Sequence, residues 1–81
     1  MTDQDTETQR KCDLITHRAA EMMIEQGASL GMALDRMLTF SAAQACKADG
    51  AFHTAAVFRS IAEQIEIGKF AHVEPKGHGG H

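Results

Sequence analysis

The chain has 81 residues, with eight Lys and Arg against eleven Asp and Glu, and a formal net charge of −3. This length indicates one domain spanning 1–81. The slight excess of acid argues against nucleic acid as the main partner, because phosphate backbones are bound by basic surfaces. Ala supplies 13 residues, whereas Leu, Ile, Val and Phe together supply only 15, so we expect a folded chain with a lean core.

Composition also bears on location. No run of apolar residues approaches the roughly 18 that a membrane-spanning helix needs. The first ten residues, MTDQDTETQR, are polar and acidic, whereas a secretory signal begins basic and continues apolar. Two Cys are too few for a framework of disulfides. We therefore expect a cytoplasmic protein with free thiols that does not associate with membranes.

The first predicted helix covers about 6–26, after a tail at 1–5. Thr6 and Gln9 have the spacing of a capping box, in which each side chain accepts a backbone N–H of the first turn. Gly27 is expected to end the helix in a left-handed conformation. The apolar residues recur in steps of three and four along one side. They are Cys12, Ile15, Ala19, Met22 and Met23.

The second predicted helix covers about 29–48, with Ser29 as its N-cap. Gly31 weakens its first turn by about 1 kcal/mol relative to Ala. The pair Asp49-Gly50 is a turn signal that ends the helix. The residues expected to face the core form one stripe along this helix. It consists of Leu30, Leu34, Met37, Leu38, Ser41, Ala45 and Ala48.

The third predicted helix covers about 51–67 and ends at Gly68. Its expected core side consists of Thr54, Phe58, Ile61, Ala62 and Ile65. The following segment, 69–81, holds three Gly and one Pro without any period, so we expect a flexible C-terminal tail. Connections of two or three residues place successive helices antiparallel. The sequence thus predicts an all-α, three-helix bundle of up-down-up topology.

Each predicted helix carries more apolar residues than one side can hold. In a monomer, the second helix would be clasped by the other two and the surplus would be ordinary surface. In an oligomer, the surplus would meet a second copy, which is a common remedy for a chain of this size. The second interpretation is favoured because the core is lean. The predicted interface residues are Met32, Phe40, Phe52, Val57 and Ile67.

Histidine and cysteine supply the candidate metal sites. His72, His78 and His81 lie in the tail, and His-rich tracts bind borderline metals. Cys12 and Cys46, which an antiparallel pairing brings toward one end of the bundle, match no zinc spacing and are interpreted as small apolar fillers. No cofactor is expected.

No sequence motif indicates catalysis. The chain lacks the GxxxxGK[ST] phosphate loop and the GxGxxG dinucleotide fingerprint, and its Ser residues have no evident base. His17 is interpreted as a surface histidine on the polar side of its helix. The expected function is therefore a non-enzymatic helical interaction module, acting as a homo-oligomer or binding another protein. Two alternatives remain: a small helix-turn-helix regulator that binds DNA, and a metal-binding protein that uses its C-terminal tail.

Overall fold

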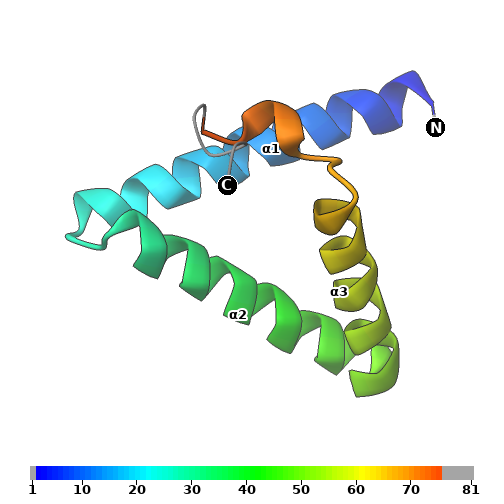
Figure 1. The fold of residues 1–81 in the computed structure, drawn as a ribbon. Coiled ribbons are helices and arrows are strands. Elements are labelled where there is room, and N and C mark those ends of the chain that lie inside the picture. Colours follow the sequence, from blue (N-terminus) through cyan, green and yellow to red (C-terminus); the bar gives the residue numbers. More distant parts are fainter. Residues whose placement is uncertain (1, 76–81) are drawn as a thin grey trace. The chain divides into compact units, whose positions relative to one another are not determined.

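The computed structural model describes residues 2–75, which form three α-helices and one 3-10 turn, without strands in that range (Figure 1). The bounds are α1 (Asp3–Glu25), α2 (Leu30–Asp49), α3 (Ala51–Glu66) and η1 (Ala71–Val73). The prediction of an all-α fold with three helices is confirmed. The predicted ends lie within a few residues of the observed ones, and the last six residues of the predicted tail lie outside the described range.

Helix α1 begins one turn earlier than predicted. The Thr2 Oγ1 atom accepts the Asp5 N–H at 3.1 Å, and the Asp5 carboxylate accepts the Thr2 N–H at 3.3 Å, so Thr2 and Asp5 form the capping box. Thr6 instead donates its hydroxyl to the Thr2 carbonyl at 3.2 Å. The predicted box at Thr6 and Gln9 is therefore wrong, and residues 3–5 are helical. Asp3 and Asp5 favour the earlier start because carboxylates stabilise the positive end of the helix dipole.

The end of α1 follows the predicted glycine. Gly27 has φ +105°, and its N–H donates to the Ile24 carbonyl at 2.9 Å. The next N–H, of Ala28, reaches back to the Met23 carbonyl at 3.1 Å, which completes a Schellman motif. The chain thereby reverses within a few residues, and α2 starts directly after the turn.

The remaining predicted helix ends are also confirmed. Ser29 caps α2, since its Oγ accepts the Met32 N–H at 3.1 Å. Gly50, with φ +87°, is the single residue between α2 and α3. Gly68 ends α3 with the same pair of backward hydrogen bonds that ends α1.

Two glycine substitutions should change stability in opposite directions. Gly27→Ala is expected to lower the free energy of unfolding by about 1–2 kcal/mol, because a Cβ disfavours the left-handed region. Gly31→Ala should raise it by up to about 1 kcal/mol, since Gly31 is helical and a Cβ there would meet only the Ser29 Oγ at 3.9 Å. Urea unfolding followed by circular dichroism, at one protein concentration, measures both. A loss of stability in Gly31→Ala would contradict this account.

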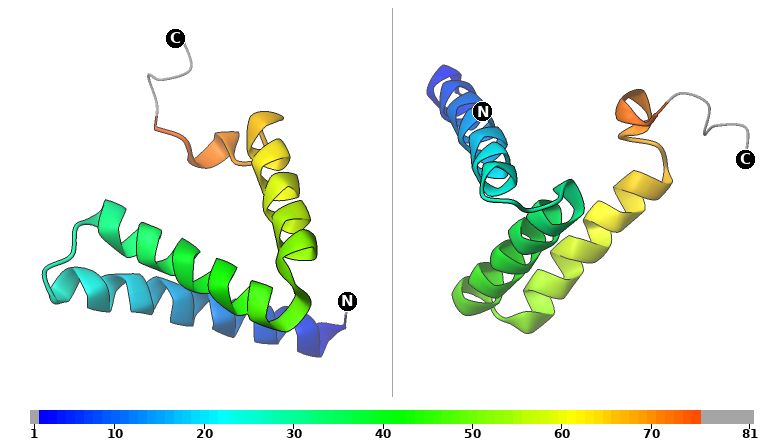
Figure 2. Two further views of the ribbon diagram at one scale, coloured as in Figure 1. Left: turned by 90° about the horizontal axis from the view of Figure 1, so that it is seen from below. Right: turned by 90° about the vertical axis from the view of Figure 1, so that its left-hand side faces the viewer.

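The chain divides into two compact units, with the boundary between Ser41 and Ala42. Helix α2 crosses this boundary as one continuous helix, as all three views show (Figures 1 and 2). The N-terminal unit contains α1 and the first part of α2, and the C-terminal unit contains the end of α2, α3 and η1. The single domain that the length indicated stays a prediction.

The packed residues of each unit are mostly small. In the N-terminal unit, Ala33 is fully buried, with 0% of its surface exposed. Its half-buried neighbours in the unit are Ala19, Ala20, Met23, Ala28 and Met37. In the C-terminal unit, Thr54 is buried, and its hydroxyl has no hydrogen-bond partner among residues 2–75. The half-buried residues there are Ala42, Ala45, Ala56, Phe58 and Gln64.

The predicted core side of α2 is partly wrong. Leu30, Leu34 and Leu38 were expected inside, but they are exposed by 49–61%. Ala33, which is not among the expected core residues, is the residue that is buried. A small side chain lets two helices approach closely, whereas a row of Leu keeps them apart. The contact in the N-terminal unit therefore forms on the Ala and Met side of α2.

Candidate functional site

The N-terminal unit contains a groove between α1 and α2, with a volume of about 620 Å³. Both helices contribute four lining residues. They are Ile15, Thr16, Ala19 and Met23 of α1, and Arg36, Met37, Phe40 and Ser41 of α2. We call this hollow the α1–α2 groove.

The α1–α2 groove is lined mainly by apolar side chains. Arg36 is its only charged lining residue, and its Nη1 lies 3.9 Å from the Asp35 carboxylate. The Thr16 hydroxyl donates to the Cys12 carbonyl at 2.9 Å, so it is already engaged within its own helix. No carboxylate, His or Cys is among the eight lining residues, so the groove has neither a general base nor a strong nucleophile.

A second hollow, of about 470 Å³, lies beside the α1–α2 turn. Three methionines line it, namely Met22, Met23 and Met32, together with Arg36 and residues 26–28 at the turn. Thioether side chains are flexible and adapt to different partners. This hollow is thus a second apolar surface of the same unit.

All five predicted interface residues are exposed, by 42–87% of their surface. Met32 and Phe40 line the two hollows of the N-terminal unit. Phe52 and Val57 lie on α3, on well-separated sides of the helix by the 100° spacing of successive residues. Ile67 is the C-cap of α3. The structure therefore distributes these residues over both units.

Sequence reasoning missed several exposed apolar residues because it assigned them to the core. They are Ile15 on α1, Leu30, Leu34 and Leu38 on α2, and Ile61 and Ile65 on α3. For the residues of α2 and α3, the available signal was their repeat at intervals of four, which identifies a row along one side of a helix but not what covers that row.

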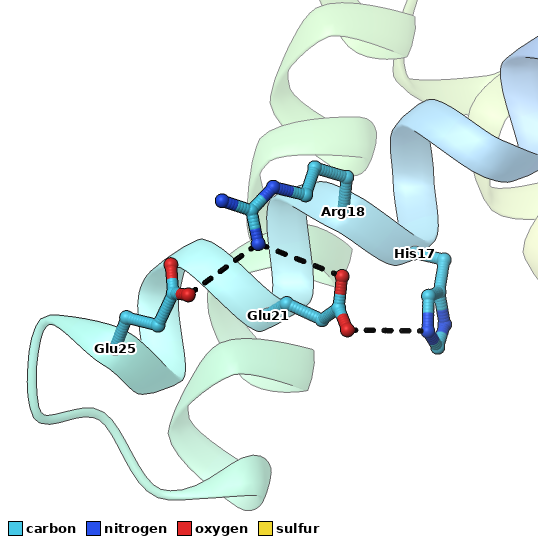
Figure 3. A network of polar contacts seen from close by, with 4 residues as sticks. All are labelled: His17, Arg18, Glu21 and Glu25. Atoms are coloured by element: carbon cyan, nitrogen blue, oxygen red, sulfur yellow. Dashed lines mark hydrogen bonds and ion pairs between the residues drawn. The ribbon is translucent and has the colours of Figure 1, made fainter.

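The clearest polar network lies on α1 (Figure 3). Arg18 Nη1 lies 3.6 Å from a Glu21 carboxylate oxygen and 3.4 Å from one of Glu25, and His17 Nε2 lies 3.7 Å from the other Glu21 oxygen (Figure 3). All four side chains are more than half exposed, and such surface pairs contribute at most about 1 kcal/mol each to stability. The network is a solvated helix surface, in keeping with the interpretation of His17.

The predicted metal residues are only partly within the described range. His72 lies in η1 and is exposed, whereas His78 and His81 lie outside the described residues. Residues 2–75 contain no group of three or more His, Cys, Asp or Glu that could hold a metal ion. Cys12 and Cys46 are free, exposed thiols, so their interpretation as core fillers is wrong. A metal site in the tail stays a prediction.

Within the described residues, each helix is too short or too polar to cross a lipid bilayer. Comparison with known proteins finds no matching protein family, no similar curated protein and no similar solved structure.

Proposed function

We propose that the chain is a non-enzymatic, cytoplasmic helical interaction module that acts as a homo-oligomer. The observation that carries the proposal is that the large apolar side chains are exposed, whereas the buried apolar residue is a small one. Among the described residues, Ala33 is the one buried apolar residue, whereas sixteen large apolar side chains are at least 40% exposed.

This distribution of apolar side chains makes the folding free energy of an isolated chain unfavourable. Ordering the backbone costs about 1–2 kcal/mol per residue, and the burial of large apolar side chains is the main term that offsets it. A buried Ala and a few half-buried neighbours supply little of that term. Burial against another subunit supplies the rest, as is common in chains of this length.

The site chemistry favours association over catalysis. Both hollows of the N-terminal unit are lined mainly by apolar side chains, and each includes Arg36 as its charged residue. Surfaces of this kind, with Met and aromatic side chains and few charges, are typical of protein interfaces.

Sedimentation equilibrium of the wild-type protein and of Phe40→Asp tests the proposal. Wild type is expected to form a dimer or larger oligomer at micromolar concentration. Phe40→Asp should weaken association at least about tenfold, because it places a carboxylate in an apolar groove. Thr39→Asp is the matched control, since Thr39 is exposed on the polar side of the same turn.

The control should associate as wild type does. A wild-type chain that stays monomeric at high micromolar concentration would overturn the proposal. If wild type and Phe40→Asp associate equally tightly, the α1–α2 groove is not part of the interface.

A further inference from the structure

We infer that the α1–α2 groove binds helix α3 of a second copy of this chain, in a reciprocal two-fold dimer. The inference rests on the proposed function and adds the two surfaces that meet. One is the groove, and the other is a row of three branched side chains on α3, Val57, Ile61 and Ile65, which we call the α3 row.

The α3 row has the pattern of a helix that docks by one side. Its members are spaced by four residues, so they lie along one side of α3, and 42–55% of their surface is exposed. Thr54 and Phe58 occupy the same side and are buried or half-buried within the C-terminal unit. This side of α3 is therefore packed near the start of the helix, at Thr54 and Phe58, and exposed toward its end, at Ile61 and Ile65.

The charges of α3 are compatible with burial of this row. The helix carries Arg59, Glu63 and Glu66, and the 100° spacing places all three on the side away from the row. The row can thus enter the groove without taking a carboxylate or a guanidinium of α3 out of water, a step that would be strongly unfavourable.

The groove and the row also agree in length. From Ile15 to Met23 the groove follows α1 for eight residue steps, or about 12 Å of helix, and the row from Val57 to Ile65 covers the same rise. Ile15 and Phe40 stand at the groove and are about two-thirds exposed. An apolar helix side laid into such a groove is a common mode of recognition.

The area involved fits a second copy as the occupant. The five exposed side chains of row and groove each offer on the order of 100 Å², so a reciprocal exchange removes about 1,000 Å² from water, the threshold of a specific interface. Each chain carries one groove and one row, so a two-fold exchange fills both and closes the assembly. A foreign helix in the groove would leave the α3 row uncovered.

Complementation between two defective variants tests the exchange. Phe40→Asp disables the groove, and Ile61→Glu disables the row. Each homodimer then has two defective contacts, whereas the mixed dimer keeps one intact contact, between the groove of Ile61→Glu and the row of Phe40→Asp. Each variant alone should associate at least about tenfold more weakly than wild type, and the mixture should form a heterodimer about tenfold tighter than either homodimer.

Ser60→Glu is the control for the row, since Ser60 is exposed beside Ile61 but points to another side of α3. It should dimerise as wild type does. Circular dichroism of each variant confirms that its helices are retained. A mixture without recovery overturns the inference, and so does Ile61→Glu dimerising as tightly as wild type, although the proposed function then survives. A monomeric wild type overturns both.

Cross-linking gives an independent measurement that requires no charged substitution. In a background of Cys12→Ser and Cys46→Ser, chains with Phe40→Cys are mixed with chains with Ile61→Cys and oxidised. A disulfide-linked heterodimer is expected in preference to either homodimer. Cross-linked homodimers in equal yield would overturn the exchange.

Discussion

Ala33→Asp is expected to abolish most of the helical circular dichroism signal of the chain. Ala33 has none of its surface exposed, so the new carboxylate would lose its hydration inside the N-terminal unit. Burying a charged group without a partner costs at least about 3 kcal/mol. A protein of 81 residues has a stability of roughly 4–12 kcal/mol, and a lean core places this chain toward the lower end.

Ala43→Asp is the matched control for this prediction. Ala43 lies on the same helix, is exposed, and makes the same change of residue with the same loss of helix propensity, about 0.7 kcal/mol. It should remain folded, and its urea midpoint should shift only slightly. If the two variants unfold at the same urea concentration, the burial of Ala33 is not what holds α1 and α2 together.

Helix positions could be predicted from the sequence because their signals are local. Gly27 and Ser29 act within a turn of their own position, and both serve as expected. The start of α1 was predicted wrongly because two threonines are each able to act as the N-cap of this helix. Thr2 with Asp5 and Thr6 with Gln9 both have capping-box spacing, and the earlier box gains another helical turn.

The packed side of α2 could not be predicted by the same means. An Ala-rich helix has several overlapping apolar sides, and periodicity ranks them by hydrophobicity, which favours Leu34 over Ala33. Packing follows the close approach of the helices instead, and this favours Ala33. Leu30, Leu34 and Leu38, which the sequence analysis placed in the core, are therefore exposed.

The α1–α2 groove lay beyond sequence reasoning for a related reason. Its lining joins Ile15 and Met23 of one helix to Arg36 and Phe40 of the next, and their proximity depends on how α1 and α2 pack. The sequence identified Phe40 as a surplus apolar residue, which was correct about its exposure. Its position at a groove depends on how α1 and α2 pack together.

The proposed association would supply burial that the chain lacks, so the thermal stability of the protein should depend on its concentration. For a dimer that unfolds to separate chains, each tenfold increase in concentration adds about 1.4 kcal/mol to the free energy of unfolding. With the unfolding entropy of two 81-residue chains, this raises the Tm by about 3–6 °C. Calorimetry over a hundredfold range of concentration measures the slope.

Variants separate this effect from general stability. Phe40→Asp should flatten the slope of Tm against concentration, because the groove no longer contributes to association. Thr39→Asp should keep the wild-type slope even if its Tm shifts, since Thr39 is exposed outside the groove. A wild-type Tm that is constant over the hundredfold range would mean that folding does not depend on a second copy, and the sixteen exposed apolar side chains would then have to be tolerated by a monomer.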